Sequence, residues 1–229
     1  MDTCLQSIFL GNFEKKCISL IISKLLGYLI IFFSFILKVP QINNMIKLKS
    51  EKGLSYVSIY LEIIIFLCSG LYGFHYENPF STYGENIIIL FQSLTILFLC
   101  WKYGEKATMS SLLGRTLFLI FLAIFTVLGV INKFPSNFWF YIGSSPIPLA
   151  SVARITQIYE SYKSKSTGPL SAFTFFLALG GSLVRVFTTL TETNDFLMVF
   201  TYAYGASLNL IILIQIFIYG NKSVKEKSS

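Results

Sequence analysis

The sequence contains little charge for its length and few residues suited to metal or redox chemistry. Only 13% of its 229 residues are charged, whereas an ordinary soluble domain carries roughly twice that fraction. There is one histidine, His75, and the four cysteines, Cys4, Cys17, Cys68 and Cys100, follow no paired spacing. We therefore expect the cysteines to be small buried hydrophobic residues rather than disulfides or metal ligands.

The sequence also lacks a recognisable catalytic arrangement. No glycine-rich phosphate loop follows a strand pattern, and no paired carboxylates lie in a span that would form a pocket. We therefore expect no enzyme activity, no cofactor and no bound metal.

Long apolar runs take the place of these features. Hydrophobic residues make up 54% of the chain, and a membrane span needs about 20 consecutive, mostly apolar residues to cross a hydrocarbon core of about 30 Å. Seven runs are long enough, at residues 17–40, 55–74, 84–102, 112–131, 136–158, 170–189 and 196–219. The pattern predicts an all-α integral membrane protein with seven transmembrane helices.

Positive charge is distributed unevenly between the gaps that separate these runs. The net charge of +7 does not indicate a nucleic-acid partner, because the basic residues gather in alternate gaps and in the tail, as expected of loops facing the cytosol. They are Lys47, Lys49, Lys52, Lys102, Lys106, Arg115, Lys163, Lys165, Lys222, Lys225 and Lys227. The bias predicts a multi-pass protein in the lipid bilayer, with its N-terminus lumenal and its C-terminus cytosolic.

An internal repeat appears when the chain is aligned with itself at an offset of 116 residues. Residues 41–55 and 157–171 are then identical at seven of fifteen positions, and Gly27 pairs with Gly143 and Lys38 with Arg154. The repeat predicts two parallel three-helix units joined by one linker helix, a 3+1+3 arrangement. The predicted parts are a lumenal segment 1–16, a first repeat 17–102, a linker helix 112–131, a second repeat 136–219 and a cytosolic tail 220–229.

Prolines within the first helix of each repeat predict interruptions of the helical backbone. Proline removes a backbone donor and clashes with the carbonyl four residues earlier, and in a bilayer the freed carbonyls need other partners. Pro40 and Gln41 form such a site in the first repeat. The second repeat has Thr156 and Gln157 instead, so its break is expected earlier, at Pro146 and Pro148. Gln41 and Gln157 are candidates for binding either a neighbouring helix or the hydroxyls of a ligand.

Charged residues within the apolar runs are the remaining candidates, because charge inside a membrane is usually paired or functional. Glu62 is expected at a depth similar to that of Lys38 and Arg154, so it can neutralise either one. Arg185 is expected near the lumenal interface. There it would bind a phosphate, pair with Glu192 or Asp195, or extend to lumenal water.

These residues resemble the PQ-loop membrane proteins, whose motif is the Pro40–Gln41 pair, and within them the endoplasmic reticulum branch required for mannose-P-dolichol utilization. The similarity covers residues 24–220 and is most specific in STGPLSAFTFFLALGGSLVRVFTTLTETND, residues 166–195. The tail, with Lys225 and Lys227 fifth and third from the end, resembles a dilysine retrieval signal of the endoplasmic reticulum.

The resemblance implies a protein that makes dolichol-phosphate mannose and dolichol-phosphate glucose usable as sugar donors in N-glycan and GPI-anchor synthesis. It would do so by moving or presenting the lipid-linked sugar, with lumenal glycosyltransferases as partners. One version has the two repeats rock about the region of Pro40 while Gln41, Gln157 and Arg185 contact sugar or phosphate. The alternatives are a SWEET-like transporter of a small sugar or amino acid, and a scaffold that transports nothing.

Overall fold

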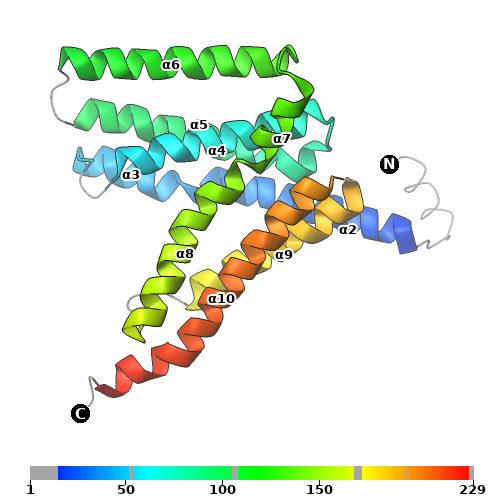
Figure 1. The fold of residues 1–229 in the computed structure, drawn as a ribbon, viewed down its shortest axis with the longest axis vertical. Helices are drawn as coiled ribbons and strands as arrows, with labels where there is room; N and C mark the ends of the chain where they lie inside the picture. The colour runs from blue at the N-terminus through cyan, green and yellow to red at the C-terminus, as the bar shows by residue number, and fades with distance from the viewer. Residues whose placement is uncertain (1–14, 52–53, 105–107, 168–171, 194, 227–229) are drawn as a thin grey trace. The chain divides into compact units, whose positions relative to one another are not determined.

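The computed structural model describes residues 15–51, 54–104, 108–167, 172–193 and 195–226, and this part of the chain is built of α-helices and their connections. Figure 1 shows the helices in chain order. They are α2 (Lys15–Leu37), α3 (Val39–Leu48), α4 (Tyr56–His75), α5 (Phe80–Tyr103), α6 (Met109–Val130), α7 (Ser136–Ser144), α8 (Pro146–Ser164), α9 (Ala172–Glu192) and α10 (Phe196–Glu226).

Among the described residues, six helical segments are long and apolar enough to cross a membrane. They are Lys15–Leu48, Tyr56–His75, Phe80–Tyr103, Met109–Val130, Ala172–Glu192 and Phe196–Tyr219. The helix expected at 136–158 is divided at Ser145 into α7, of nine residues, and α8, of 19 residues. The interruption and the polar second half of α8 explain why this predicted span does not qualify on length and composition alone.

The chain forms two compact units, and the first to be described comprises residues 27–143. Within it α5 packs against both α3 and α4, and α6 runs beside α4. The third helix of the first repeat therefore lies between the other two. Two glycines permit close approach: a Cβ at Gly27 would lie 2.6 Å from the carbonyl oxygen of Ser81, and one at Gly73 would lie 2.5 Å from the ring of Tyr83.

The other unit comprises residues up to 26 together with residues 144–229. Its helix α10 packs against both α8 and α9, so the third helix again lies in the middle. Phe175, Ile212, Leu213 and Ile216 form a buried core between α9 and α10. Although Gly180 and Gly181 resemble a helix-packing motif, a Cβ at either would meet nothing within 4 Å.

The two repeats share backbone detail as well as helix order. Lys49 follows the last residue of α3 and Lys165 follows the last residue of α8, and both are C-cap residues in the left-handed conformation, with φ of 47° and 51°. These lysines are equivalent at the 116-residue offset. An αL residue is a common way to end a helix, although it is unusual for lysine, and its recurrence indicates that both first helices end by the same geometry.

The cysteines do not all follow the sequence prediction. Cys68 and Cys100 are buried thiols that form no disulfide, as expected of small hydrophobic residues. Cys17 is disulfide-bonded, so the expectation was wrong for this residue. The spacing of the cysteines in the sequence did not indicate this bond, because a disulfide requires that two cysteines lie close together in space and needs no sequence motif. Cys4 lies outside the described residues.

Candidate functional site

The break in the first helix is the centre of the candidate site. Helix α2 ends at Leu37, Lys38 stands between the helices, and α3 begins at Val39 with Pro40 as its second residue. Proline is tolerated in the first turn of a helix because the donor it lacks has no partner there. Pro40 therefore ends one helix and starts the next, and the residues just before it must find new hydrogen-bond partners.

Gln92 of α5 supplies these partners. Its Nε2 donates to the backbone carbonyls of Ser34 at 3.0 Å and Phe35 at 2.7 Å, and its Oε1 accepts from the backbone N–H of Lys38 at 3.3 Å. One amide thus replaces the bonds that the break removes from the helical ladder. This is the compensation that an interrupted helix in a membrane needs.

A charged pair lies beside the same break. Lys38 Nζ is 2.6 Å from Oε2 of Glu62 on α4, with side chains that are 12% and 35% exposed. The hydroxyl of Ser93, next to Gln92 on α5, lies 3.5 Å from the same carboxylate oxygen. Three helical elements of the first repeat therefore meet through polar groups at one level of an otherwise apolar bundle.

The second repeat is interrupted at a different place. Helix α7 ends at Ser144 and α8 begins at Pro146, with Pro148 two residues further on, whereas Thr156 and Gln157 lie within unbroken α8. Its hydrogen-bonding amide is Gln215 of α10, whose Nε2 donates to the carbonyl of Ile158 at 3.0 Å. As in the first repeat, a glutamine of the third helix binds the backbone of the first.

Arg154 is the counterpart of Lys38, but its surroundings differ. The position equivalent to Glu62 is Ala178, and the guanidinium carbon of Arg154 lies 5.2 Å from the centroid of the Phe175 ring. Within the described part of the chain, no carboxylate lies within ion-pair distance of Arg154. The equivalent positions of the two repeats thus hold a cation paired with a carboxylate in one copy and a cation on an aromatic face in the other.

Arg185 on α9 is buried, with only 4% of its surface exposed. This contradicts the alternative in which the side chain extends to lumenal water. One turn further along α9, Thr188 is fully buried. Two turns beyond Arg185, Glu192 accepts a 2.6 Å hydrogen bond from Ser23 and lies 3.5 Å from Lys24 Nζ. Asp195 caps α10 by accepting from the N–H of Met198 at 3.0 Å. Both acids considered as partners for Arg185 therefore have other contacts.

The structure brings together only some of the predicted residues. Lys38 and Glu62 form an ion pair, and Pro40 and half-buried Gln41 follow Lys38 at the start of α3. Gln92, Ser93 and Gln215, which complete the polar contacts, were missed. Each stands within an apolar run of α5 or α10, and a polar side chain inside a membrane helix is itself a signal of a buried interhelical bond.

Comparisons with known proteins follow the internal repeat. The family model "PQ loop repeat" matches residues 22–82 and 138–198, two stretches whose starts are separated by the same offset of 116 residues. Human "Solute carrier family 66 member 3" is 24% identical over 193 residues, covering 82% of this chain and 90% of the human protein.

A solved structure shares the arrangement of helices. The structure of a eukaryotic SWEET transporter matches with a TM-score of 0.70 and 18% sequence identity, over 89% of this chain and 98% of that chain. At this identity the likeness speaks for the fold alone. The fold is the 3+1+3 arrangement expected from the sequence, with α6 as the linker between two triplets.

Proposed function

Since the chain belongs to the PQ loop repeat family, we propose that it enables the use of dolichol-phosphate mannose and dolichol-phosphate glucose in N-glycan and GPI-anchor synthesis. It binds the lipid-linked sugar and moves or presents its polar head, without a catalytic step of its own. The specific resemblance at residues 166–195 is the sequence support for this substrate. Residues 168–171 and 194 of that segment lie outside the described part of the chain.

The observation that carries a moving role is the pair of interrupted first helices. An interruption at Lys38 and another at Ser145 give each triplet a place where the helix direction can change without breaking a continuous hydrogen-bond ladder. The Lys38–Glu62 pair places charge inside an apolar span, where ionisable groups are usually functional. We infer that the triplets rock about the Pro40 region.

Three residues are proposed to contact the substrate during this movement. Gln41 and Gln157 are both half-buried and have amide groups that suit sugar hydroxyls. Arg185 has the planar donor set that suits a phosphate. Arg154 is a further candidate, because it has no carboxylate partner among the described residues.

The proposed location is the endoplasmic reticulum membrane, with the N-terminus in the lumen and the C-terminus in the cytosol, where lumenal glycosyltransferases would take the donor. The alternating distribution of lysine and arginine supports this orientation. The retrieval signal would consist of Lys225 and Lys227. Lys227 lies outside the described residues, as does the side chain of Lys225.

A second candidate is transport of a small solute such as a sugar or an amino acid. It is supported by the names of the related proteins, a solute carrier and a SWEET transporter. A third possibility is a scaffold that presents the carrier lipid without moving it. The three functions differ in which molecule crosses the membrane.

The test is reconstitution of the purified chain in liposomes with labelled dolichol-phosphate mannose on one leaflet. Leaflet exchange above that of empty vesicles is expected, and Lys38→Met should slow it by disturbing the break. Exchange equal to that of empty vesicles would eliminate movement of the lipid. Uptake of free labelled mannose or amino acid by the same vesicles, without lipid exchange, would establish the transporter instead.

A further inference from the structure

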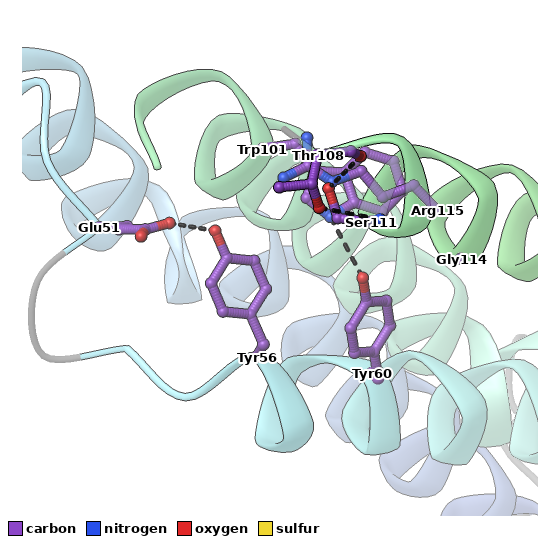
Figure 2. A pocket seen from close by; sticks show the side chains of 8 residues that line it. All are labelled: Glu51, Tyr56, Tyr60, Trp101, Thr108, Ser111, Gly114 and Arg115. Carbon is purple, nitrogen blue, oxygen red and sulfur yellow. Dashed lines mark hydrogen bonds between the residues drawn. The ribbon is translucent and has the colours of Figure 1, made fainter. Parts of the chain in front are cut away.

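A cavity of about 550 Å³ lies between α4, α5 and the start of α6 (Figure 2). It is lined by Glu51, Tyr56, Tyr60, Trp101, Thr108, Ser111, Gly114 and Arg115. All of these residues belong to one compact unit. Its volume is within the range of about 300 to 1,000 Å³ found for small-molecule sites.

One end of the cavity offers hydrogen-bond donors and positive charge. The guanidinium carbon of Arg115 lies 5.6 Å from the centroid of the Trp101 ring, a contact that orients the group while leaving its N–H edge for a ligand. No carboxylate of the described residues lies within ion-pair distance of it. Trp101 Nε1 donates to the hydroxyl of Tyr60 at 3.2 Å, so that hydroxyl can donate its own proton. This end suits a phosphate.

The other end offers acceptors. Figure 2 shows Glu51 on the opposite side of the cavity from Arg115, with its carboxylate accepting a hydrogen bond from Tyr56. Ser111 lies one turn before Arg115 on α6 and beside it in Figure 2. Its hydroxyl donates to the carbonyl of Thr108 at 2.8 Å, so Ser111 belongs to the Arg115 end of the cavity. A carboxylate repels a phosphate but accepts from hydroxyls. The cavity is therefore polarised along its length.

We propose that this cavity binds the head group of a membrane lipid in which a phosphate is joined to a sugar. The phosphate contacts Arg115 and Tyr60, and the sugar hydroxyls contact Glu51. The hydrocarbon chain lies along α6, whose side chains Leu113 and Leu117 are 61% and 56% exposed. The choice of lipid rests on the proposed function, whereas the position and polarity of the site rest on the geometry.

Away from the cavity, the contact between α4 and α6 becomes apolar. Leu122 of α6 is buried, and a Cβ at Gly129 of α6 would lie 2.9 Å from the Leu71 side chain of α4. A second cavity, of about 400 Å³, opens beyond this apolar contact at the other end of α4 and α6, near His75 and Asn132. The first cavity is thus a docking place for a head group at one face.

Gly114 provides a direct way to fill the site. A Cβ at Gly114 would meet nothing within 4 Å, so a larger side chain there enters the cavity without displacing an atom of the protein. Gly180 on α9 has the same open surroundings and lies in the other compact unit. Gly114→Leu and Gly180→Leu are therefore a matched pair that differs in access to the cavity.

The experiment is photolabelling and binding in nanodiscs with the full-length chain and a photoactivatable dolichol-phosphate mannose. Labels are expected on Glu51 and on residues 54–60, 101–104 and 108–118. Arg115→Gln should weaken binding about tenfold or more, the usual effect of losing a charged hydrogen bond. Gly114→Leu should abolish binding, and Gly180→Leu should leave it within about twofold of the wild type. Thermal midpoints equal to that of the wild type would show that the variants are folded. If Arg115→Gln is unstable, the binding measured for Gly114→Leu tests the site instead.

Competitors identify the source of the phosphate. Dolichol phosphate and dolichol-phosphate mannose should both compete, the second more strongly, and soluble mannose 1-phosphate should compete weakly. Labelling elsewhere, unchanged binding in both cavity variants, or equal competition by mannose 1-phosphate would overturn the assignment. Such results would leave lipid exchange in liposomes intact if the proposed function is right. Labelling in the cavity without any lipid exchange would instead preserve this site and refute movement of the lipid.

Discussion

Lys38 Nζ and Glu62 Oε2 lie 2.6 Å apart at the point where the first helix of the first repeat is interrupted. The pair links the residue between α2 and α3 to the middle of α4. The equivalent positions of the second repeat hold Arg154 and Ala178, so this link exists in one triplet and is absent by sequence from the other. The two triplets therefore have the same helix order but different electrostatics at their first helices.

Separate loss of either charge should destabilise the protein more than loss of both. Glu62→Gln leaves Lys38 without its carboxylate, and Lys38→Met leaves Glu62 without its ammonium group. Each should lower the free energy of unfolding by about 1–3 kcal/mol, less than for a fully buried pair because Glu62 is partly exposed. The double variant should be closer to the wild type. Thermal midpoints in one detergent would measure the coupling, and additive effects would show that the pair contributes nothing.

Gln92 should stabilise the protein mainly when the helix is interrupted between α2 and α3. Gln92→Leu removes three hydrogen bonds to Ser34, Phe35 and Lys38, and the predicted loss is about 2 kcal/mol. Pro40→Ala allows a continuous helix, so Gln92→Leu should have a smaller effect in that background. Thr95→Val, which alters only a bond to its own helix, serves as the control. An equal effect of Gln92→Leu with and without Pro40 would contradict this role.

The fold was predictable because its determinants are periodic and local. Apolar length locates the helices, the 116-residue repeat gives the 3+1+3 order, and Pro40 and Pro146 mark the interruptions. The partners across helices were harder to predict. Gln92 faces the break because of the rotation of α5 about its axis, and no residue near it in sequence indicates that rotation. Glu62 had two possible basic partners at similar depth, and only the packing distinguishes Lys38.

The glycines also show that contacts between helices are hard to predict from the sequence, and they permit a further test. Gly180 and Gly181 form a double glycine of the kind found at close helix contacts, yet a Cβ at either would meet nothing within 4 Å, whereas one at Gly27 or Gly73 would lie within 2.6 Å of a neighbouring atom. Gly27→Ala would place a Cβ against a backbone oxygen of Ser81, which cannot turn away as a side chain can. We expect a loss of about 1–3 kcal/mol in the free energy of unfolding.

Gly180→Ala is the matched control, since its Cβ would meet no neighbour within 4 Å. Alanine has the higher helix propensity, so this variant should be neutral or more stable by up to about 1 kcal/mol. Thermal midpoints of the two variants measure the difference. Equal midpoints would mean that α2 does not approach Ser81 as closely as described.

Arg185 permits a functional test of the second triplet. Arg185→Gln keeps hydrogen-bonding capacity but removes the charge, and we expect it to lower the amount of full-length lipid-linked oligosaccharide in cells. Arg185→Lys keeps the charge without the planar fork and should retain part of the activity if charge is what matters. Because Arg185 is only 4% exposed, both variants must be compared at wild-type protein abundance. Normal full-length precursors in Arg185→Gln would remove this residue from the proposed mechanism.

Orientation in the membrane can be tested by glycosylation, which occurs on the lumenal side. The sequence Asn221-Lys222-Ser223 is an acceptor motif in the basic tail. If lysine and arginine mark the cytosolic side, this site stays unmodified, whereas an acceptor motif introduced before Lys15 is modified. Glycosidase-sensitive mobility shifts would report both. Modification of Asn221 would reverse the orientation predicted from the basic residues.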